Sequence, residues 1–178
     1  YAQATKLLKT KKLDHLIGVE RVHGHSVEVR SSAKTALIED WKKAYQDNPN
    51  KSLVMMSYSN KDVRDLNGQV RSLLKDSGVI GREDMTYTIT REVEDEFGRK
   101  EKLKETRGFS KGDRIVFTRN KKSLGVKNGS MGTILSLDKN KIEVALDKDK
   151  TFSFSPHLFS FFDQGWAVTI HKSQGTTV

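Results

Sequence analysis

The feature that most constrains the fold is a short apolar run followed at once by a helix-start signal. Ser52-Leu-Val-Met-Met-Ser-Tyr58 has the length and composition of a buried strand. Residues 59–62 then give a capping-box pattern with Asp in the fourth place. The helix that follows ends at Gly78, and its apolar face consists of Val63, Leu66, Val70, Leu73 and Leu74. Strand 52–58 and helix 60–77 form an α/β unit, which predicts part of a parallel sheet layer.

The residues before this unit contain further candidate elements. Residues 2–11 favour a short helix, and residues 17–30 alternate in polarity, which indicates a hairpin. A helix over 32–47 follows, with an amphipathic face made of Leu37, Trp41, Ala44 and Tyr45. We expect this helix to join the same layer. A parallel strand needs neighbours, and few obvious ones are present.

The sequence pattern changes at Gly112, where short predicted strands begin to alternate with tight polar turns. The predicted strands are 113–119, 133–137, 141–146 and 151–154. Turn signals separate them, among them Asn128-Gly129 and Gly132. Four short strands in about 45 residues predict a small antiparallel barrel.

Residues 82–107, between these two parts, are highly charged. In one interpretation, Thr86-Tyr-Thr-Ile-Thr90 and Lys102-Leu-Lys104 pair around Phe97-Gly98-Arg99 as an exposed β-arm. The other interpretation is a disordered loop.

The 178 residues carry a net charge of +9. A basic excess favours an anionic partner, most commonly nucleic acid, although a solvated lysine-rich surface has the same composition. The absence of cysteine excludes a disulfide framework and a thiolate metal site. Because no apolar run has the length of a membrane span and the N-terminus lacks a signal-peptide core, we expect a cytoplasmic protein without a membrane partner.

The residues of a P-loop nucleotide site are missing from the sequence. A P-loop requires Gly-Lys followed by Ser or Thr, and the dipeptide Gly-Lys occurs nowhere. The acidic run Glu94-Asp-Glu96 does not end an aliphatic strand, so it does not resemble a magnesium-binding motif. His23 and His25 lack a third ligand at a suitable spacing. We therefore predict no catalytic residue, no metal site and no ATP hydrolysis by this chain alone.

The densest cluster of polar groups is Thr169-Ile-His-Lys-Ser-Gln-Gly175, directly after the apolar Trp166-Ala-Val168. A lysine charge and hydroxyl donors suit phosphate contacts, and a terminal glycine lets the backbone approach a ligand closely. The same residues also fit an ordinary strand or helix end, so the pattern alone leaves both interpretations open.

A resemblance to a known family adds to this pattern. Trp166-Ala-Val-Thr-Ile-His-Lys-Ser-Gln-Gly175 resembles motif V of the RecD-like branch of superfamily 1 DNA helicases and matches its fixed positions. Gly112-Asp-Arg-Ile-Val-Phe-Thr-Arg-Asn120 and Gly125-Val-Lys-Asn-Gly129 resemble the small Src-homology-3-like barrel that precedes motif V there. Leu53-Val-Met-Met-Ser-Tyr-Ser-Asn60, with Val63 and Leu66-Asn67, resembles the strand and helix that carry motif IV. The spacing and the ending Gln174-Gly-Thr-Thr-Val178 are most similar to the helicase region of TraA-type conjugative relaxases.

The resemblance implies roles for individual residues. The implied contacts to single-stranded DNA are Thr169, His171, Lys172 and Asn60, together with a basic loop of the barrel at Arg119, Lys121, Lys122 and Lys127. Gln174 and Gly175 match positions near the junction with the ATP site. For the basic loop, simple exposure to solvent is the alternative interpretation.

The resemblance also implies an α/β architecture. Residues 1–108 would form most of an incomplete second RecA-like, P-loop-type motor lobe with its lead-in. Residues 109–165 would form the inserted barrel. Residues 166–178 would return to the motor lobe. Because the P-loop, the acidic motif and motif VI are missing, we expect a fragment of a longer bacterial enzyme that is inactive by itself. ATP and Mg would bind to the intact parent enzyme. We expect no cofactor to bind to this fragment. The partners would be single-stranded DNA and the remaining helicase and relaxase domains.

Three other functions fit the same residues. The first is a chromosomal RecD-like helicase without a relaxase domain. The second is a non-catalytic nucleic-acid-binding module built on the barrel, for which Thr169→Ala and His171→Ala would leave binding unchanged. The third is a scaffold whose charge keeps it soluble, which would show no salt-sensitive DNA binding.

Overall fold

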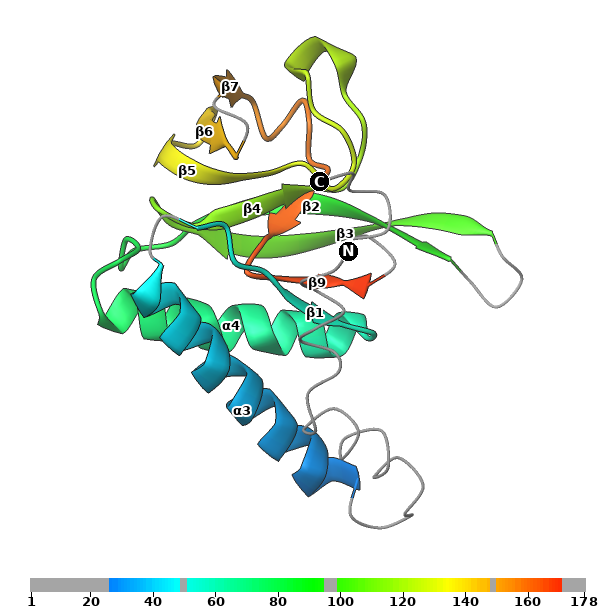
Figure 1. Cartoon of the computed structure of the whole chain (residues 1–178). Helices are drawn as coiled ribbons and strands as arrows, with labels where there is room; N and C mark the ends of the chain where they lie inside the picture. The colour runs from blue at the N-terminus through cyan, green and yellow to red at the C-terminus, as the bar shows by residue number, and fades with distance from the viewer. Residues whose placement is uncertain (1–25, 49–50, 95–98, 148–149, 171–178) are drawn as a thin grey trace. The chain divides into compact units, whose positions relative to one another are not determined.

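A computed structural model describes residues 26–48, 51–94, 99–147 and 150–170 (Figure 1). The chain divides into two compact units, Tyr1–Lys51 and Ser52–Val178. The helices α3 and α4, which lie in the described part of the chain, are not apolar enough over a sufficient length to cross a membrane.

The first unit contains one described helix, α3, over Ser26–Asp47. Trp41 and Tyr45, predicted on one helical face, stack with ring centroids 5.0 Å apart. The helix begins six residues before the predicted bound at 32, so the predicted hairpin is wrong over 26–30. Once a helix has nucleated, each further residue adds a hydrogen bond, and this outweighs a short alternating pattern. The rest of that hairpin and the predicted helix 2–11 lie outside the described residues.

The predicted α/β unit is present in the second unit as β1 over Met55–Ser57 and α4 over Asn60–Asp76. Ser59 is the N-cap of α4, and its hydroxyl oxygen accepts from the backbone N–H of Asp62 at 3.0 Å. Gly78 has a φ of 72° just after the helix, a left-handed conformation that favours glycine. The buried face of α4 includes the predicted residues Leu66, Val70 and Leu74.

The charged segment folds as the β-arm and not as a disordered loop over its described residues. Strands β2, Met85–Glu94, and β3, Lys100–Phe109, pair antiparallel along their whole length. The arm is longer than predicted and extends away from the rest of the second unit in Figure 1.

The segment after Gly112 forms a five-stranded antiparallel sheet in the order β7-β6-β5-β4-β8. The strands are β4 Arg114–Phe117, β5 Met131–Leu137, β6 Ile142–Leu146, β7 Thr151–Phe154 and β8 Phe162–Gln164. A short 3-10 helix, η1, covers Lys122–Leu124 between β4 and β5. The four predicted strands are confirmed, and β8 was not predicted. Because β7 and β8 are the two edges and do not pair with each other in the described residues, a closed barrel is not seen.

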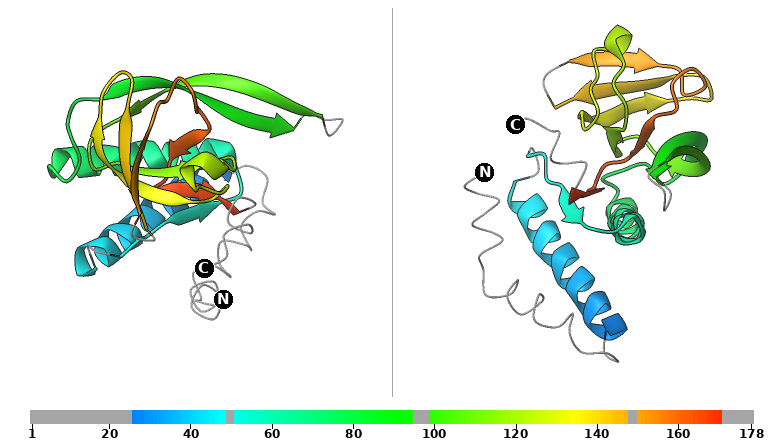
Figure 2. Two further views of the ribbon diagram at one scale, coloured as in Figure 1. Left: turned by 90° about the horizontal axis from the view of Figure 1, so that it is seen from above. Right: turned by 90° about the vertical axis from the view of Figure 1, so that its right-hand side faces the viewer.

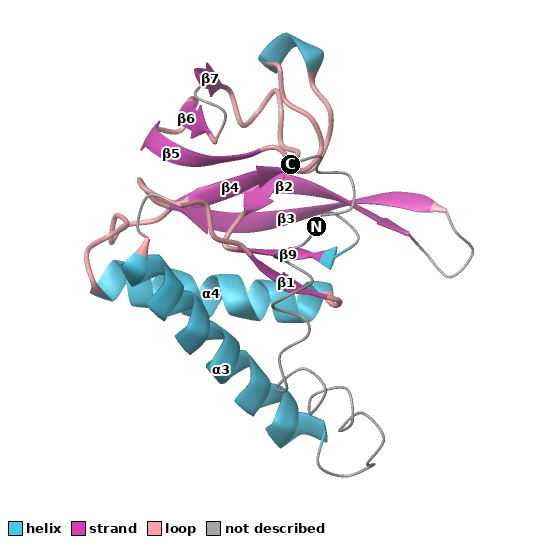
Figure 3. Cartoon of the chain, in the orientation of Figure 1, coloured by secondary structure: helices cyan, strands magenta, loops and turns pink. Residues whose placement is uncertain are grey.

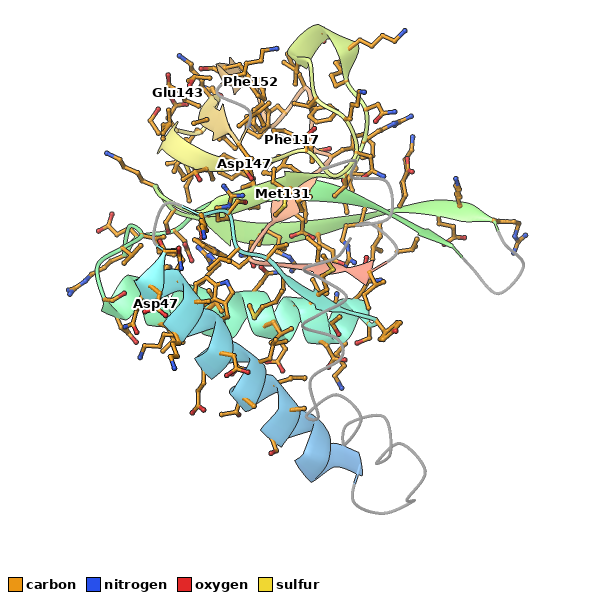
Figure 4. The ribbon with its side chains drawn as sticks, in the orientation of Figure 1. Asp47, Phe117, Met131, Glu143, Asp147 and Phe152 are labelled. Atoms are coloured by element: carbon orange, nitrogen blue, oxygen red, sulfur yellow. The ribbon has the colours of Figure 1, made fainter. Side chains whose placement is uncertain are left out.

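The β2–β3 hairpin covers the apolar face of this open sheet (Figure 2). Tyr87, Ile89 and Phe109 from the hairpin are buried in one core with residues of the sheet. The rings of Phe109 and Phe162 lie 5.2 Å apart, and Phe117 packs against Phe152 at 5.8 Å (Figure 4). The backbone N–H of Thr90 also donates to the carbonyl oxygen of Ser160 at 2.7 Å. The hairpin and the sheet therefore share a single hydrophobic core.

Gly132, predicted at a turn, lies instead inside β5. A Cβ atom at this position would lie 2.6 Å from the carbonyl oxygen of Ala145, so the close approach of β6 requires glycine. The other predicted turn is confirmed, because Gly129 has a φ of 85°.

The last strand, β9 over Ala167–Thr169, leaves the sheet and pairs parallel with β1. Met55 lies opposite Ala167, and Ser57 lies opposite Thr169. Figure 3 shows β9 beside β1, with the hairpin and the sheet above these two strands in this view. In the sequence, the hairpin and the five-stranded sheet are therefore inserted between β1 and β9, which pair with each other beside α4.

The phenol of Tyr87 provides a test of hairpin packing. Burial, followed by the charge of Asp138, raises the pKa of Tyr87 from 10.0 to about 12, and the hydroxyl donates to the carbonyl oxygen of Asp138 at 2.7 Å. Because the pKa of Tyr87 is higher in the folded state, the protonated phenol stabilises the fold. This stabilisation is complete below pH 10.0 and is lost as the pH rises through about 12. In denaturant unfolding, Tyr87→Phe should be less stable than the wild type below pH 10.0, and the difference should shrink at higher pH. An equal difference at every pH would contradict this packing.

Candidate nucleic-acid interface at the ends of β1 and β9

Asn67 of α4 fixes the start of β9 through its buried side-chain amide. Its oxygen accepts from the backbone N–H groups of Trp166 at 3.0 Å and Ala167 at 2.9 Å. Its nitrogen donates to the carbonyl oxygens of Ala167 at 3.0 Å and Val63 at 2.9 Å. Asn67 is 3% exposed, and these four bonds use its two donors and both acceptor positions of its oxygen. The position of β9 on α4 is therefore set by specific hydrogen bonds as well as by apolar packing.

Thr169 and Asn60, two residues predicted to contact DNA, lie at the same end of this arrangement. Since β1 and β9 run parallel, their carboxyl ends meet where α4 begins. Thr169 is the last residue of β9 and is buried, whereas Asn60 is the first residue of α4 and is exposed. Both line the same pocket. Ligands of α/β proteins bind at the carboxyl ends of parallel strands, and helix N-termini attract anions.

Three arginines line the same pocket and pair with two carboxylates. Arg64 and Arg91 each lie 3.5 Å from a Glu105 oxygen, and Arg107 also pairs with Glu105. Asp163 lies 3.8 Å from Arg91 and 3.6 Å from Arg107. These charges come from α4, both strands of the hairpin and β8, so the pocket depends on the packing of all four elements.

Asp113 joins α4, the start of the sheet and the segment before β9. Its side chain is completely buried and accepts from Arg71 Nε at 3.0 Å and Nη2 at 2.8 Å. It also accepts from the indole N–H of Trp166 at 3.2 Å and the backbone N–H of Ser110 at 2.7 Å. A buried carboxylate is stable only with charge and hydrogen-bond partners, and Asp113 has both.

Asp84 extends this cluster toward solvent. It accepts from Arg71 Nη2 at 2.5 Å and from the hydroxyl of Ser110 at 2.7 Å, and Lys75 Nζ lies 2.9 Å from it. Burial raises the pKa of Asp84, but hydrogen bonds from Arg71, Lys75 and Ser110 outweigh burial and lower it to about 2. For Arg71, burial lowers the pKa, and the bonds to Asp113 and Asp84 raise it overall. The charged forms of both side chains are therefore stabilised in the folded chain.

The predicted basic loop is exposed and lies outside the lining of this pocket. It connects β4 to β5 and carries the exposed residues Arg119, Lys121, Lys122 and Lys127. Arg119 lies 4.7 Å above the ring of Phe161 and 3.9 Å from Glu92. The remaining predicted residues lie outside the described residues; they are His171, Lys172, Gln174 and Gly175. In the described ranges no group of acidic or histidine side chains has the arrangement of a metal site.

Several residues that build the site were missed by sequence reasoning. Asn67 and Arg71 occupy the same face of α4 as Leu66 and Val70. Polar residues four apart within an apolar face are a signal of buried partners, and this signal was available in the sequence. The arginines of the arm gave no such signal, because their partners belong to other elements.

Comparison with known proteins identifies the chain. No protein-family profile matches it. A probable conjugal transfer protein TraA of Sinorhizobium fredii is 31% identical over 85% of this chain, and TraA of Agrobacterium fabrum is 33% identical over 84%. This chain is homologous to a segment of the TraA conjugal transfer proteins. It spans 12% of the length of these relatives.

Solved helicase structures share the fold of this TraA-like segment. Pif1 helicase from Bacteroides in complex with ADP-AlF3 and single-stranded DNA has a TM-score of 0.51 at 20% identity, over 72% of this chain and 33% of that chain. Bacteroides Pif1 in complex with ADP-AlF4 has a TM-score of 0.50 at 20% identity, with the same coverage. The mixed α/β fold therefore resembles that of a Pif1 helicase motor domain.

The Asn67 hydrogen bonds lead to a prediction about stability. In denaturant unfolding, Asn67→Ala should lower the free energy of unfolding by about 2–4 kcal/mol, because it leaves buried backbone groups of β9 without partners. Gln69→Ala is the control on the same helix, since Gln69 is exposed and bonds to Asp65, and it should change stability by less than about 0.5 kcal/mol. Equal effects of the two substitutions would show that Asn67 does not anchor β9.

Proposed function

We propose that this TraA-like segment is the DNA-facing part of the second motor lobe of a conjugative helicase-relaxase. In the intact parent, ATP hydrolysis with Mg would drive DNA unwinding and transfer during plasmid conjugation. The homology to TraA and the likeness to the Pif1 fold support this assignment. The Pif1 structures were determined with ADP-AlF complexes and with single-stranded DNA, which agrees with an ATP-dependent parent that acts on DNA.

One observation carries the proposal, namely the position of Thr169. Asn67 holds β9 so that Thr169 ends beside the N-terminus of α4 and the side chain of Asn60. A hydroxyl, an amide and a helix N-terminus together suit a phosphate group of single-stranded DNA. His171 and Lys172, which follow β9 in the sequence, would continue this track, and Gln174 and Gly175 would lie near the ATP cleft.

The rest of the chain takes its roles from the same proposal. Residues 1–108 and 166–178 would belong to the incomplete RecA-like lobe, and residues 109–165 would form a Src-homology-3-like accessory element that grips DNA. Its basic loop, with Arg119, Lys121, Lys122 and Lys127, would lie along the strand. The other domains of the parent would complete the motor and supply the relaxase.

Binding of an unstructured deoxythymidine oligonucleotide tests the role of Thr169. Thr169→Val keeps the β-branched shape of a strand residue and removes the hydroxyl. It should weaken binding about tenfold, because the variant cannot form that hydrogen bond to a charged phosphate. The affinity is measured by titration at several salt concentrations, and thermal unfolding checks that the variant is folded.

The basic loop provides the comparison that separates the two DNA-binding interpretations. Replacing Lys121, Lys122 and Lys127 by Ala should make the slope of log affinity against log salt concentration shallower, by roughly 0.7 for each phosphate that the loop no longer neutralises. Lys139→Ala with Lys141→Ala, in the exposed turn after β5, is the matched control and should leave affinity unchanged. If Thr169→Val binds like the wild type and the loop variant does not bind, the chain is a nucleic-acid-binding module built on the sheet. If the wild type does not bind single-stranded DNA, the proposed function is wrong.

A further inference from the structure

The β-arm supplies cationic groups to the pocket that Thr169 of β9 and Asn60 of α4 line. Arg91 of β2 and Arg107 of β3 line the pocket together with Asn60 and Thr169. The side chain of Arg91 is 8% exposed, and its Nη2 donates to the amide oxygen of Asn60 at 2.6 Å. The arm therefore reaches the first turn of α4 through a charged hydrogen bond donor.

Arg91 is buried with part of its hydrogen-bonding capacity unused. Its Nε atom is buried and has no hydrogen-bond partner among the residues that the structure describes. A carboxylate oxygen of Asp163 lies 3.8 Å from Nε, which is too far for a hydrogen bond. A buried guanidinium N–H without an acceptor is costly, so Arg91 keeps donor capacity for a further acceptor.

The charges around the pocket define that acceptor. Three arginines face two carboxylates, Glu105 and Asp163, so the network has one positive charge in excess. A single phosphodiester carries one negative charge, and its two free oxygens suit the fork of donors on a guanidinium. Asn60 presents a neutral oxygen to Arg91, and an anionic phosphate oxygen is the stronger acceptor.

We propose that Arg91, with Arg64 and Arg107, forms a binding site for one backbone phosphate of single-stranded nucleic acid next to Thr169. A phosphate oxygen replaces the amide oxygen of Asn60 at Arg91, and Asn60 turns to donate to the same phosphate. The β-arm is then part of the DNA track as well as the cover of the sheet. This inference rests on the proposed function, because it places a second contact at the same strand of DNA.

The chain offers a closely matched control for Arg91. Arg114 is also a mostly buried arginine whose buried Nε lacks a partner in the described part of the chain, but it does not line the pocket. It donates to both oxygens of Asp147, which is labelled in Figure 4, each at 2.5 Å. Arg91→Gln and Arg114→Gln therefore remove the same kind of buried charge at two different places.

The experiment compares Arg91→Gln, Arg64→Gln and Arg114→Gln in titrations with a deoxythymidine oligonucleotide, alongside thermal unfolding. Arg91→Gln should weaken binding about tenfold and reduce its salt dependence, because it removes a charged hydrogen bond to phosphate. Arg64→Gln, at a half-exposed side chain, should weaken binding by about threefold without affecting the fold. Arg114→Gln should lower the melting temperature and leave affinity within about twofold of the wild type. Arg64→Gln keeps the test decisive if Arg91→Gln does not fold.

A second pair of probes identifies the source of the phosphate. With an oligonucleotide whose backbone is neutral methylphosphonate, the wild type and Arg91→Gln should bind equally weakly, and pyrophosphate should not displace the normal oligonucleotide. Displacement by pyrophosphate that depends on Arg91 would overturn the assignment to a nucleic-acid backbone. Unchanged binding by both Arg91→Gln and Arg64→Gln, with Thr169→Val weakened, would overturn the arginine site and leave the proposed function standing. Absence of oligonucleotide binding by the wild type would instead reject the proposed function.

Discussion

The carboxylate of Asp113 is the group on which the other parts of the second unit depend. It is fully buried, and its partners belong to α4, to the segment between β3 and β4, and to the residue that precedes β9. Removing one partner of a buried ion pair costs about 3–5 kcal/mol, because the remaining charge is left in a medium of low polarity. In the folded state this penalty couples the three parts, since Asp113 has all its partners only when the helix, the sheet and the strand that ends in Thr169 are in position.

The hairpin illustrates how an open sheet avoids exposing an apolar face. The edges β7 and β8 do not pair with each other in the described residues, and the side chains of β2 and β3 cover the core that a closed barrel would enclose. The outward half of the same hairpin is charged and exposed. The β2–β3 hairpin therefore has two kinds of surroundings. Its apolar residues pack in the core of the sheet, and its arginines lie between the sheet and the first turn of α4.

Features with local causes were predictable from the sequence. The cap at Ser59, the end of α4 near Gly78 and the four strands after Gly112 follow from signals within a few residues. The strand β8 was missed because it follows a run of aromatic residues without regular alternation. The early start of α3 was missed because a short alternating segment resembled a strand.

Features that depend on distant partners were not predictable in the same way. Thr169 and Asn60 were selected from a resemblance, and the structure brings them to one pocket. Asp113 and Arg91 were not selected, because their partners lie far away in sequence, whereas the position of Asn67 within the apolar face of α4 was a signal that went unused. A lone aspartate or arginine in a charged segment gives no indication in the sequence of whether it faces solvent or a buried partner.

The parallel pairing of β1 with β9 has a consequence for the order of folding. Asn67 and the strand it holds are 100 residues apart in sequence, and the hairpin and the sheet lie between them. Closing so long a loop is entropically costly, whereas the hairpin and the neighbouring strands of the sheet join residues that are close in sequence. The intervening elements are therefore expected to fold first and bring the two distant segments together. In that sequence of events, a newly synthesised chain acquires its pocket last, and an error in the insert also removes the pocket.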